Sequence, residues 1–222
     1  MRHTLHGNPD YGELVVELEA GETFLAESGA MAWLTGSVRP KGRLVGGLGR
    51  ALLRKLLGGE SLFLGEYRAD GPARIGFSPR LPGTVLHRKL DGKPYNLTGG
   101  SFLACTEGVD VRPRFGGLKA FFSSEGAFLL ECSGHGDLFF NSYGAVVERE
   151  LSGDPDDALL VDNGHLVAWE PTLDYTIAGS GGLKQTLFSG EGLLMRFQGR
   201  GKILLQSRHF ASLAQWLRPY CK

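Results

Sequence analysis

The chain lacks the cysteine patterns that define disulfide-rich and cysteine zinc proteins. It has three cysteines, Cys105, Cys132 and Cys221, and no two of them form a Cys-x-x-Cys pair. An odd number without that spacing indicates neither a disulfide framework nor a zinc site. We expect Cys105 and Cys132 to be small buried residues and Cys221 to be a thiol of the tail.

Long apolar runs and a charge excess are also missing. No segment approaches the ~20 consecutive apolar residues of a membrane-spanning helix, and the amino terminus lacks the apolar core of a signal peptide. These features predict a cytoplasmic protein. Basic and acidic residues number 24 each, so net charge identifies no partner. Nucleic-acid binding is not expected, since Lys and Arg cluster only within residues 39–55.

Glycine, in contrast, is abundant, with 34 residues. Because glycine supplies positive φ at turns and bulges, this composition favours many short strands joined by tight turns. Leu14, Val16 and Leu18 alternate with other residues, the pattern of a strand with one buried face. Short apolar runs at residues 138–140 and 203–205 follow glycine-containing segments and predict strands buried on both faces. The sequence therefore predicts an all-β fold.

The sequence Gly-Gly-Leu occurs three times, at residues 46–48, 116–118 and 181–183. Each copy is followed by an acid and an apolar run, and each is preceded by a glycine that starts another apolar strand, namely Gly29, Gly100 or Gly164. This order indicates three internally repeated units, at residues 12–85, 86–146 and 147–208, with pseudo-threefold organisation. No linker separates the units, so we expect one domain over residues 1–222.

Several glycine-containing segments are typical of turns. Residues 69–72, 81–83, 90–93 and 152–155 combine glycine with proline or aspartate. Residues 134–136 and 199–201, both Gly-x-Gly, superficially resemble phosphate loops, but no helix start with a Lys-Ser/Thr pair follows them. We therefore interpret both as tight hairpin turns.

The carboxy terminus has a helical pattern. Phe210, Leu213, Ala214 and Leu217 are spaced by three and four residues, Ser207 can cap the start, and Pro219 ends the run. These features predict a helix over residues 207–218 that packs its apolar side on the sheet.

Self-association is expected from the strands themselves. Strands that are apolar on both faces need cover, and open sheet edges can pair with another chain. We expect a closed homo-oligomer, most simply a trimer.

Residues 48–57 form a second helix-like segment, too short to cross a bilayer at ~1.5 Å per residue. Its leucines cover about half the circumference of a helix, opposite its arginines. It either packs on its own sheet or a neighbouring subunit, or contacts a membrane surface or a partner protein. The contact residues would be Leu48, Arg50, Leu52, Leu53, Arg54, Leu56 and Leu57.

Three acids, Glu60, Glu125 and Glu191, occupy corresponding places after the Gly-Gly-Leu copies. If the units are equivalent, these carboxylates could hold a cation, but the simpler expectation is a structural role in accepting backbone amides.

The histidines predict no metal, cofactor or catalytic site. His135 and His165 belong to no His-x-His pair, and His3 and His6 lie in the terminal segment. Asp162 and His165 lack the Gly-x-Ser-x-Gly turn that exposes a serine nucleophile. We expect the carboxylate to accept turn amides and the imidazole to be hydrogen-bonded near a strand start.

Six blocks carry a resemblance to a known family. They are ESGAM (27–31), GESLF (59–63), GSFLA (100–104), VDNGHLVA (161–168), GGLK (181–184) and SGEGL (189–193). In this order they resemble the signature blocks of the family of altered inheritance of mitochondria protein 24, over roughly residues 10–208. The resemblance implies a fold similar to the tryptophan RNA-binding attenuator protein, a double-stranded β-helix or β-sandwich. Eukaryotic members are linked to organisation of the mitochondrial inner membrane, and the family contributes no catalytic residues.

Together these features predict a non-enzymatic, oligomeric β-scaffold or adaptor that contacts a membrane or a partner. The alternative is a β-barrel that binds a small molecule or a metal. An enzyme needs a water-accessible pocket with converging polar groups, whereas a scaffold needs an extensive interface and a filled interior.

Overall fold

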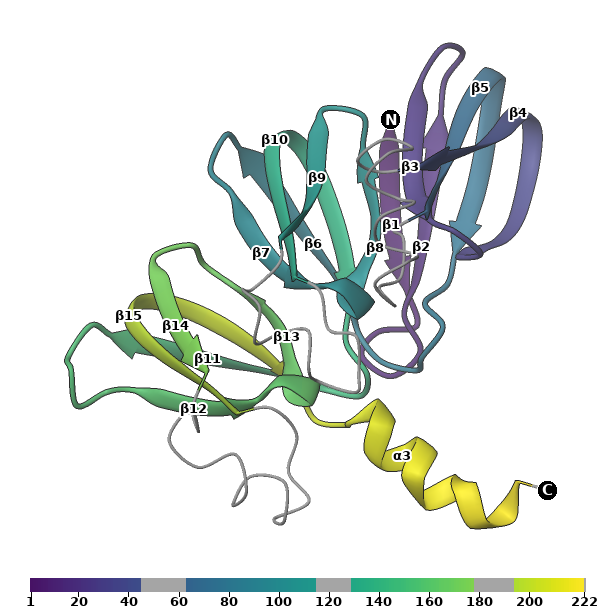
Figure 1. Cartoon of the computed structure of the whole chain (residues 1–222). Helices are drawn as coiled ribbons and strands as arrows, with labels where there is room; N and C mark the ends of the chain where they lie inside the picture. The colour runs from purple at the N-terminus through teal and green to yellow at the C-terminus, as the bar shows by residue number, and fades with distance from the viewer. Residues whose placement is uncertain (45–62, 115–128, 178–193, 222) are drawn as a thin grey trace.

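The structure, a computed structural model, describes residues 1–44, 63–114, 129–177 and 194–221 (Figure 1). Within these ranges 15 strands form one hydrogen-bonded sheet whose strands pair antiparallel. The all-β prediction is therefore confirmed. No helix in the same ranges is long and apolar enough to cross a bilayer.

The strands fall into three consecutive groups. The first strand group contains β1 (Arg2–His6), β2 (Glu13–Leu18), β3 (Thr23–Glu27), β4 (Met31–Leu44) and β5 (Phe63–Phe77). The second strand group contains β6 (Val85–Asp91), β7 (Tyr95–Thr98), β8 (Phe102–Thr106), β9 (Val109–Arg114) and β10 (Leu129–Asn141). The third strand group contains β11 (Val146–Ser152), β12 (Leu159–Asp162), β13 (Leu166–Trp169), β14 (Leu173–Ile177) and β15 (Leu194–Gln206). The helices are η1 (Gly99–Ser101), η3 (Asn163–His165), α3 (Phe210–Leu217) and η4 (Arg218–Tyr220).

Each strand group is organised by its last and longest strand. β5 pairs with β2, β3 and β4, while β10 pairs with β6, β7, β8 and β9. In the same way β15 pairs with β11, β12, β13 and β14. Two further pairings, β3 with β8 and β7 with β13, join one strand group to the next. The three groups consequently follow one another through the molecule (Figure 1).

The core runs across these junctions. Phe139 of β10 packs in one apolar cluster with residues of the first strand group, including Phe24 and Phe77. A second cluster joins residues of all three groups, among them Leu25, Phe102 and Val167. The prediction of strands buried on both faces is confirmed for residues 138–140, which are all buried, and for Ile203 and Leu204, whereas Leu205 is half-buried. Leu14, Val16 and Leu18 are also buried, as the alternation predicts, but Val15 on the opposite face is buried too. Neighbouring strand groups therefore share their hydrophobic cores.

The prediction of hairpin turns at the two Gly-x-Gly sequences is wrong. Both lie inside long strands, 134–136 in β10 and 199–201 in β15. β10 changes its partner there, from β9 up to Gly134 to β6 from His135 onward. β15 changes from β14 to β11 in the same way, between Gly199 and Arg200. The glycines permit a bend within a strand that continues, so they do not end it.

The other predicted turns have mixed outcomes. Residues 69–72 lie within β5 and are not a turn between strands. Here β4 shifts register against β5, between Gly36 and Val38, so the glycine and proline mark an irregularity of a continuing strand. The remaining three segments lie at or beyond strand ends and connect strands as predicted.

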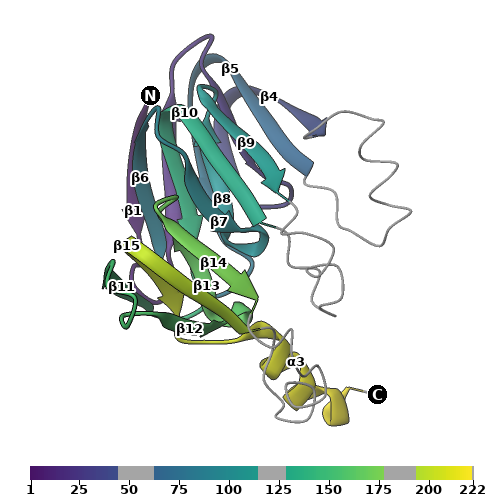
Figure 2. The same cartoon turned by 60° about the vertical axis from the view of Figure 1, so that its left-hand side comes forward.

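The carboxy-terminal helix is present, but its packing differs from the prediction. α3 begins at Phe210, and His209, not Ser207, occupies the position before it. None of its residues is buried, and Phe210, Trp216 and Leu217 are exposed. Figures 1 and 2 show the helix projecting away from the strands. The prediction that it packs on the sheet is wrong, because helical periodicity identifies an apolar face but not what covers it.

Candidate functional site

The residues predicted for partner or membrane contact lie outside the described ranges. This applies to Leu48, Arg50, Leu52, Leu53, Arg54, Leu56 and Leu57, and equally to Glu60, Glu125 and Glu191. The roles given to these residues stay predictions.

The cysteines and the Asp162–His165 segment have the places that the sequence predicts. Cys105 and Cys132 are buried and Cys221 is exposed. Burial raises the pKa of the Cys132 thiol to about 12, which keeps it protonated and unreactive. Asp162 Oδ1 accepts a hydrogen bond from the Gly164 amide at 2.9 Å. His165 Nδ1 lies 2.8 Å from the Gln206 carbonyl, at the start of β13.

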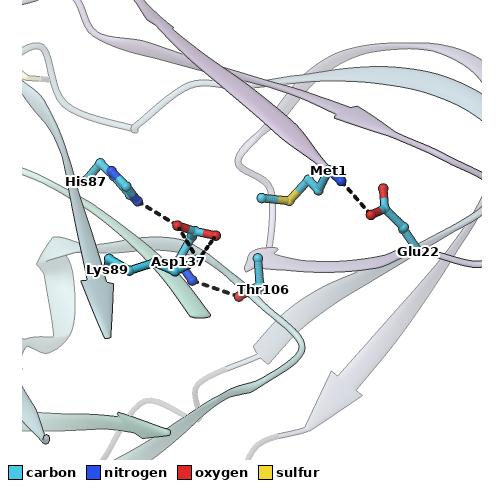
Figure 3. Close-up of polar contacts among 6 residues, drawn as sticks. All are labelled: Met1, Glu22, His87, Lys89, Thr106 and Asp137. Atoms are coloured by element: carbon cyan, nitrogen blue, oxygen red, sulfur yellow. Dashed lines mark hydrogen bonds and ion pairs between the residues drawn. The ribbon is translucent and has the colours of Figure 1, made fainter. Parts of the chain in front are cut away.

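A polar cluster that the sequence did not predict surrounds Asp137 of β10 (Figure 3). His87 and Lys89 of β6 both contact its carboxylate, through His87 Nε2 at 2.9 Å and Lys89 Nζ at 3.1 Å. The backbone amide of Asp137 donates to Thr106 Oγ1 at 2.9 Å. His87 and Lys89 are two residues apart on one strand, so they share a face and meet the same carboxylate. In the sequence, the only indication of this cluster is the spacing of His87 and Lys89, because Asp137 comes from a distant segment.

The cluster continues into the amino-terminal strand. The ring of His87 stacks on Phe139 with centroids 5.0 Å apart, and His3 of β1 lies 4.5 Å from His87 and 4.9 Å from Phe139. Nearby, the Met1 ammonium contacts the carboxylate of Glu22 (Figure 3). In the part of the chain that the structure describes, no group of three or more metal-ligating side chains occurs. The contacts of this cluster fasten β1 and β6 over the core.

The environment shifts the pKa of two members of this cluster. Burial lowers the pKa of His3, and the neighbouring His87 acts in the same direction, while Asp137 opposes both. Burial alone would raise the pKa of Asp137, but hydrogen bonds from His87 and Lys89 outweigh it and hold the pKa below its ordinary value.

These shifts predict that acidification loosens the amino-terminal strand. A folded-state pKa below the ordinary value of 6.5 means that unfolded His3 binds its proton first, so stability falls as the pH drops through that value. The depressed pKa of Asp137 removes further stability at lower pH. We expect the urea midpoint to decrease on acidification and to decrease less in His3→Gln. Urea titrations of both proteins at several pH values measure this, and an equal or larger decrease in the variant would contradict the role of His3.

The junctions between strand groups form a second feature with functional potential. At the first junction β3 pairs with β8, with Leu25 opposite Cys105 and Ala26 opposite Ala104. At the second junction β7 pairs with β13, with Asn96 opposite Trp169 and Leu97 opposite Ala168. β8 and β13 are accordingly hydrogen-bonded on both edges. Their side chains from Phe102 to Cys105 and from Leu166 to Trp169 are buried.

Two strands at the ends of this series present exposed apolar residues. In the described ranges β4 pairs only with β5, and β12 pairs only with β15. Met31 and Trp33 of β4 are 38% and 36% exposed, and Leu160 of β12 is 53% exposed. Side chains of this size on a strand edge that lacks a neighbour are a typical feature of an interaction surface. Alignment of Gly29, Gly100 and Gly164 places Met31 with Phe102 and Leu166, all three apolar, so only the strand pairing shows that β4 has a single partner strand in the described ranges.

The described fold is that of an all-β protein whose successive strand groups share one sheet. The family described as "Mitochondrial biogenesis AIM24" matches residues 3–208. The chain belongs to this family.

Two proteins of Streptococcus pyogenes are similar to the whole chain. An uncharacterized protein of serotype M6, M6_Spy0233, is 31% identical over 228 residues, which cover 99% of this chain and 91% of the relative. The X-ray structure of SPYM3_0169 superposes with a TM-score of 0.82 at 29% identity and covers 99% of both chains. The fold is thus found in an experimental structure of a related protein.

Proposed function

We propose that the protein is a homo-oligomeric scaffold without catalytic activity, built from three repeated strand groups. One observation carries the proposal: large apolar side chains stay exposed on β4 and β12, each of which has a single partner strand among the described residues. Exposing Met31, Trp33 and Leu160 to water is unfavourable by about 25 cal/mol per Å² of apolar surface. A soluble chain offsets that cost when another protein surface covers these residues.

The repeat within the chain is supported by the registers of its strands. The pairing of β8 with β10 has a shift of register after Phe102. The pairing of β13 with β15 has a shift at the corresponding place, after Leu166. β4 has the same irregularity against β5, after Met31. Three independent strands do not acquire the same irregularity by chance at the residues that the glycine alignment makes equivalent. A double-stranded β-helix arrangement of these units remains part of the proposal.

The scaffold role is favoured over catalysis by what fills the interior. Aromatic and aliphatic side chains occupy the core from end to end, including Phe24, Phe102, Phe139, Trp169 and Phe197. The carboxylate of Asp137 is engaged by His87 and Lys89, and rings of His3 and Phe139 cover the His87 imidazole. Groups held in this way stabilise a surface and are poorly placed to reach a substrate.

α3 supports contact with a partner beyond a second copy of the chain. Phe210, Trp216, Leu217 and Tyr220 are exposed on α3 and η4. Residues 207–222 contain three basic residues and no acid. Such a helix suits an acidic protein surface or an anionic lipid surface, in keeping with the contact predicted for residues 48–57.

Sedimentation velocity over a concentration series tests the proposal. We expect a species of at least two chains, with a trimer as the simplest closed form. A protein that sediments as a single chain at every concentration would rule out the self-associating scaffold.

A further inference from the structure

Among the described strands, β4 and β12 each have one partner only, and both correspond to strands that are paired at the two internal junctions. The two internal junctions, β3 with β8 and β7 with β13, have the same register relative to the repeat glycines. Leu25 and Asn96 each lie four residues before the repeat glycine, and they stand opposite Cys105 and Trp169 respectively. Ala26 and Leu97, three residues before that glycine, stand opposite Ala104 and Ala168.

β12 has the position of β3 and β7 in its own strand group. It pairs with the first part of the long strand β15, as β3 pairs with β5 and β7 with β10. Leu160 and Val161 lie four and three residues before Gly164. Leu160 therefore corresponds to Leu25 and Asn96, and Val161 corresponds to Ala26 and Leu97. The edge that β3 and β7 use for the next strand group has no partner strand in β12 among the residues that the structure describes.

The first part of β4 has the position of β8 and β13. Trp33 stands opposite Gly76 of β5, as Ala104 stands opposite Phe139 and Ala168 opposite Leu204. Leu34 stands opposite Ile75, which makes it the counterpart of Cys105 and Trp169. The counterparts of Met31, Phe102 and Leu166, are 0% and 2% exposed, whereas Met31 is 38% exposed. We attribute this difference to pairing: β8 and β13 have a partner strand on both edges, whereas β4 has one partner strand within the described ranges.

We propose that β12 of one copy of the chain pairs antiparallel with residues 31–35 of β4 in a second copy. The register carried over from the internal junctions places Leu160 opposite Leu34 and Val161 opposite Trp33. This inference rests on the proposed self-association and specifies its interface. Figures 1 and 2 show β4 and β12 at opposite ends of the succession of strand groups, and in the described ranges they are not paired with each other, so the proposed pairing links different copies.

The assembly that follows is head to tail. Each copy offers one β4 edge and one β12 edge, and the two surfaces differ, so the contact is heterologous. A heterologous contact continues the sheet from copy to copy and forms a ring if the rotation closes. The pairing also removes from water the apolar side chains of Met31, Trp33 and Leu160, which lie on these two strands.

A pair of engineered cysteines tests the register directly. In a Cys221→Ser background, the variant Leu34→Cys with Leu160→Cys brings two thiols opposite each other only between copies. Directly opposite strand residues have Cβ atoms about 4.5–5.5 Å apart, close to the distance that a disulfide spans. We expect mild oxidation to give a ladder of covalent multimers on non-reducing gels. Either single variant should give no ladder.

The matched control shifts one thiol by a single residue. Thr35→Cys with Leu160→Cys places the two side chains on opposite faces of the pairing, and we expect cross-linking roughly tenfold slower or less. Equal ladders from both double variants would overturn the register. A faster-migrating single chain in place of a ladder would show pairing within one copy and overturn the proposal.

A charged variant separates this inference from the proposed function. Leu160→Lys places an ammonium in the paired edge, and we expect the dissociation constant of the oligomer to rise at least roughly tenfold. Tyr11→Lys, at an exposed aromatic residue outside β4 and β12, should leave it unchanged. Circular dichroism checks that both variants fold. If the unaltered protein is an oligomer that Leu160→Lys does not weaken, the edge pairing is wrong while the scaffold stands; if the unaltered protein is a single chain, both fail.

Discussion

Replacing Phe139 with alanine is expected to lower the free energy of unfolding by about 3–5 kcal/mol. The side chain is fully buried in β10 and lies between core rings and the polar cluster. Its centroid is 6.0 Å from that of Phe24, and His87 stacks on it from the outside. Alanine would leave a cavity at the point where the first and second strand groups share a core, and His3 and His87 would lose the surface on which they rest.

Thermal unfolding followed by circular dichroism and urea titration measures this loss. For a protein of this size, a loss of that order corresponds to a decrease of roughly 10 °C in the melting temperature. Phe139→Leu retains most of the volume and should cost much less. Tyr11→Ala is the exposed control and should change stability by less than about 0.5 kcal/mol. If Phe139→Ala were no more destabilising than Tyr11→Ala, the shared core between the first two strand groups would be disproved.

The sequence predicted the class of the fold because strand patterns are local. Leu14, Val16 and Leu18 alternate, and residues 138–140 are apolar throughout, so each stretch indicates its own burial. Glycine was less decisive, since positive φ serves a turn and a bend within a strand equally well. The Gly-x-Gly sequences were assigned to turns for that reason, and only the pairing of β9 and β6 with the same strand shows otherwise.

The candidate sites depended on information that a single sequence does not contain. His3, His87 and Asp137 come from three separate strands, and no local spacing brings them together. The open edges of β4 and β12 are recognisable only by comparison with their paired counterparts β8 and β3. The helix face of α3 was found by periodicity, yet its exposure depends on where the chain leaves β15. Local sequence patterns thus predicted the strands and the helix, whereas the pairing of strands in the tertiary structure determines which of their faces and edges are exposed.

The glycines at which the long strands change partners give the second large expected effect. Gly134 has φ +96° and Gly199 has φ +109°, in the region that other residues rarely adopt. A Cβ on Gly134 would collide with the carbonyl oxygen of Gly108, and one on Gly199 would lie 2.6 Å from the carbonyl oxygen of Thr172. Both obstacles are backbone atoms, which cannot rotate away. We expect Gly134→Ala and Gly199→Ala each to lower the free energy of unfolding by about 2–4 kcal/mol.

Gly71 of β5 provides the matched control for these two substitutions. It lies at the irregular middle of the long strand of the first group, has no positive φ, and a Cβ there would meet no atom within 4 Å. Gly71→Ala should therefore change the free energy of unfolding by less than about 0.5 kcal/mol. Urea titrations of the three alanine variants compare them directly. Equal effects at all three positions would mean that the bends in β10 and β15 do not require glycine. A loss of stability confined to the variants at Gly134 and Gly199 would show that each long strand needs the positive φ of its glycine to change from one partner strand to the next.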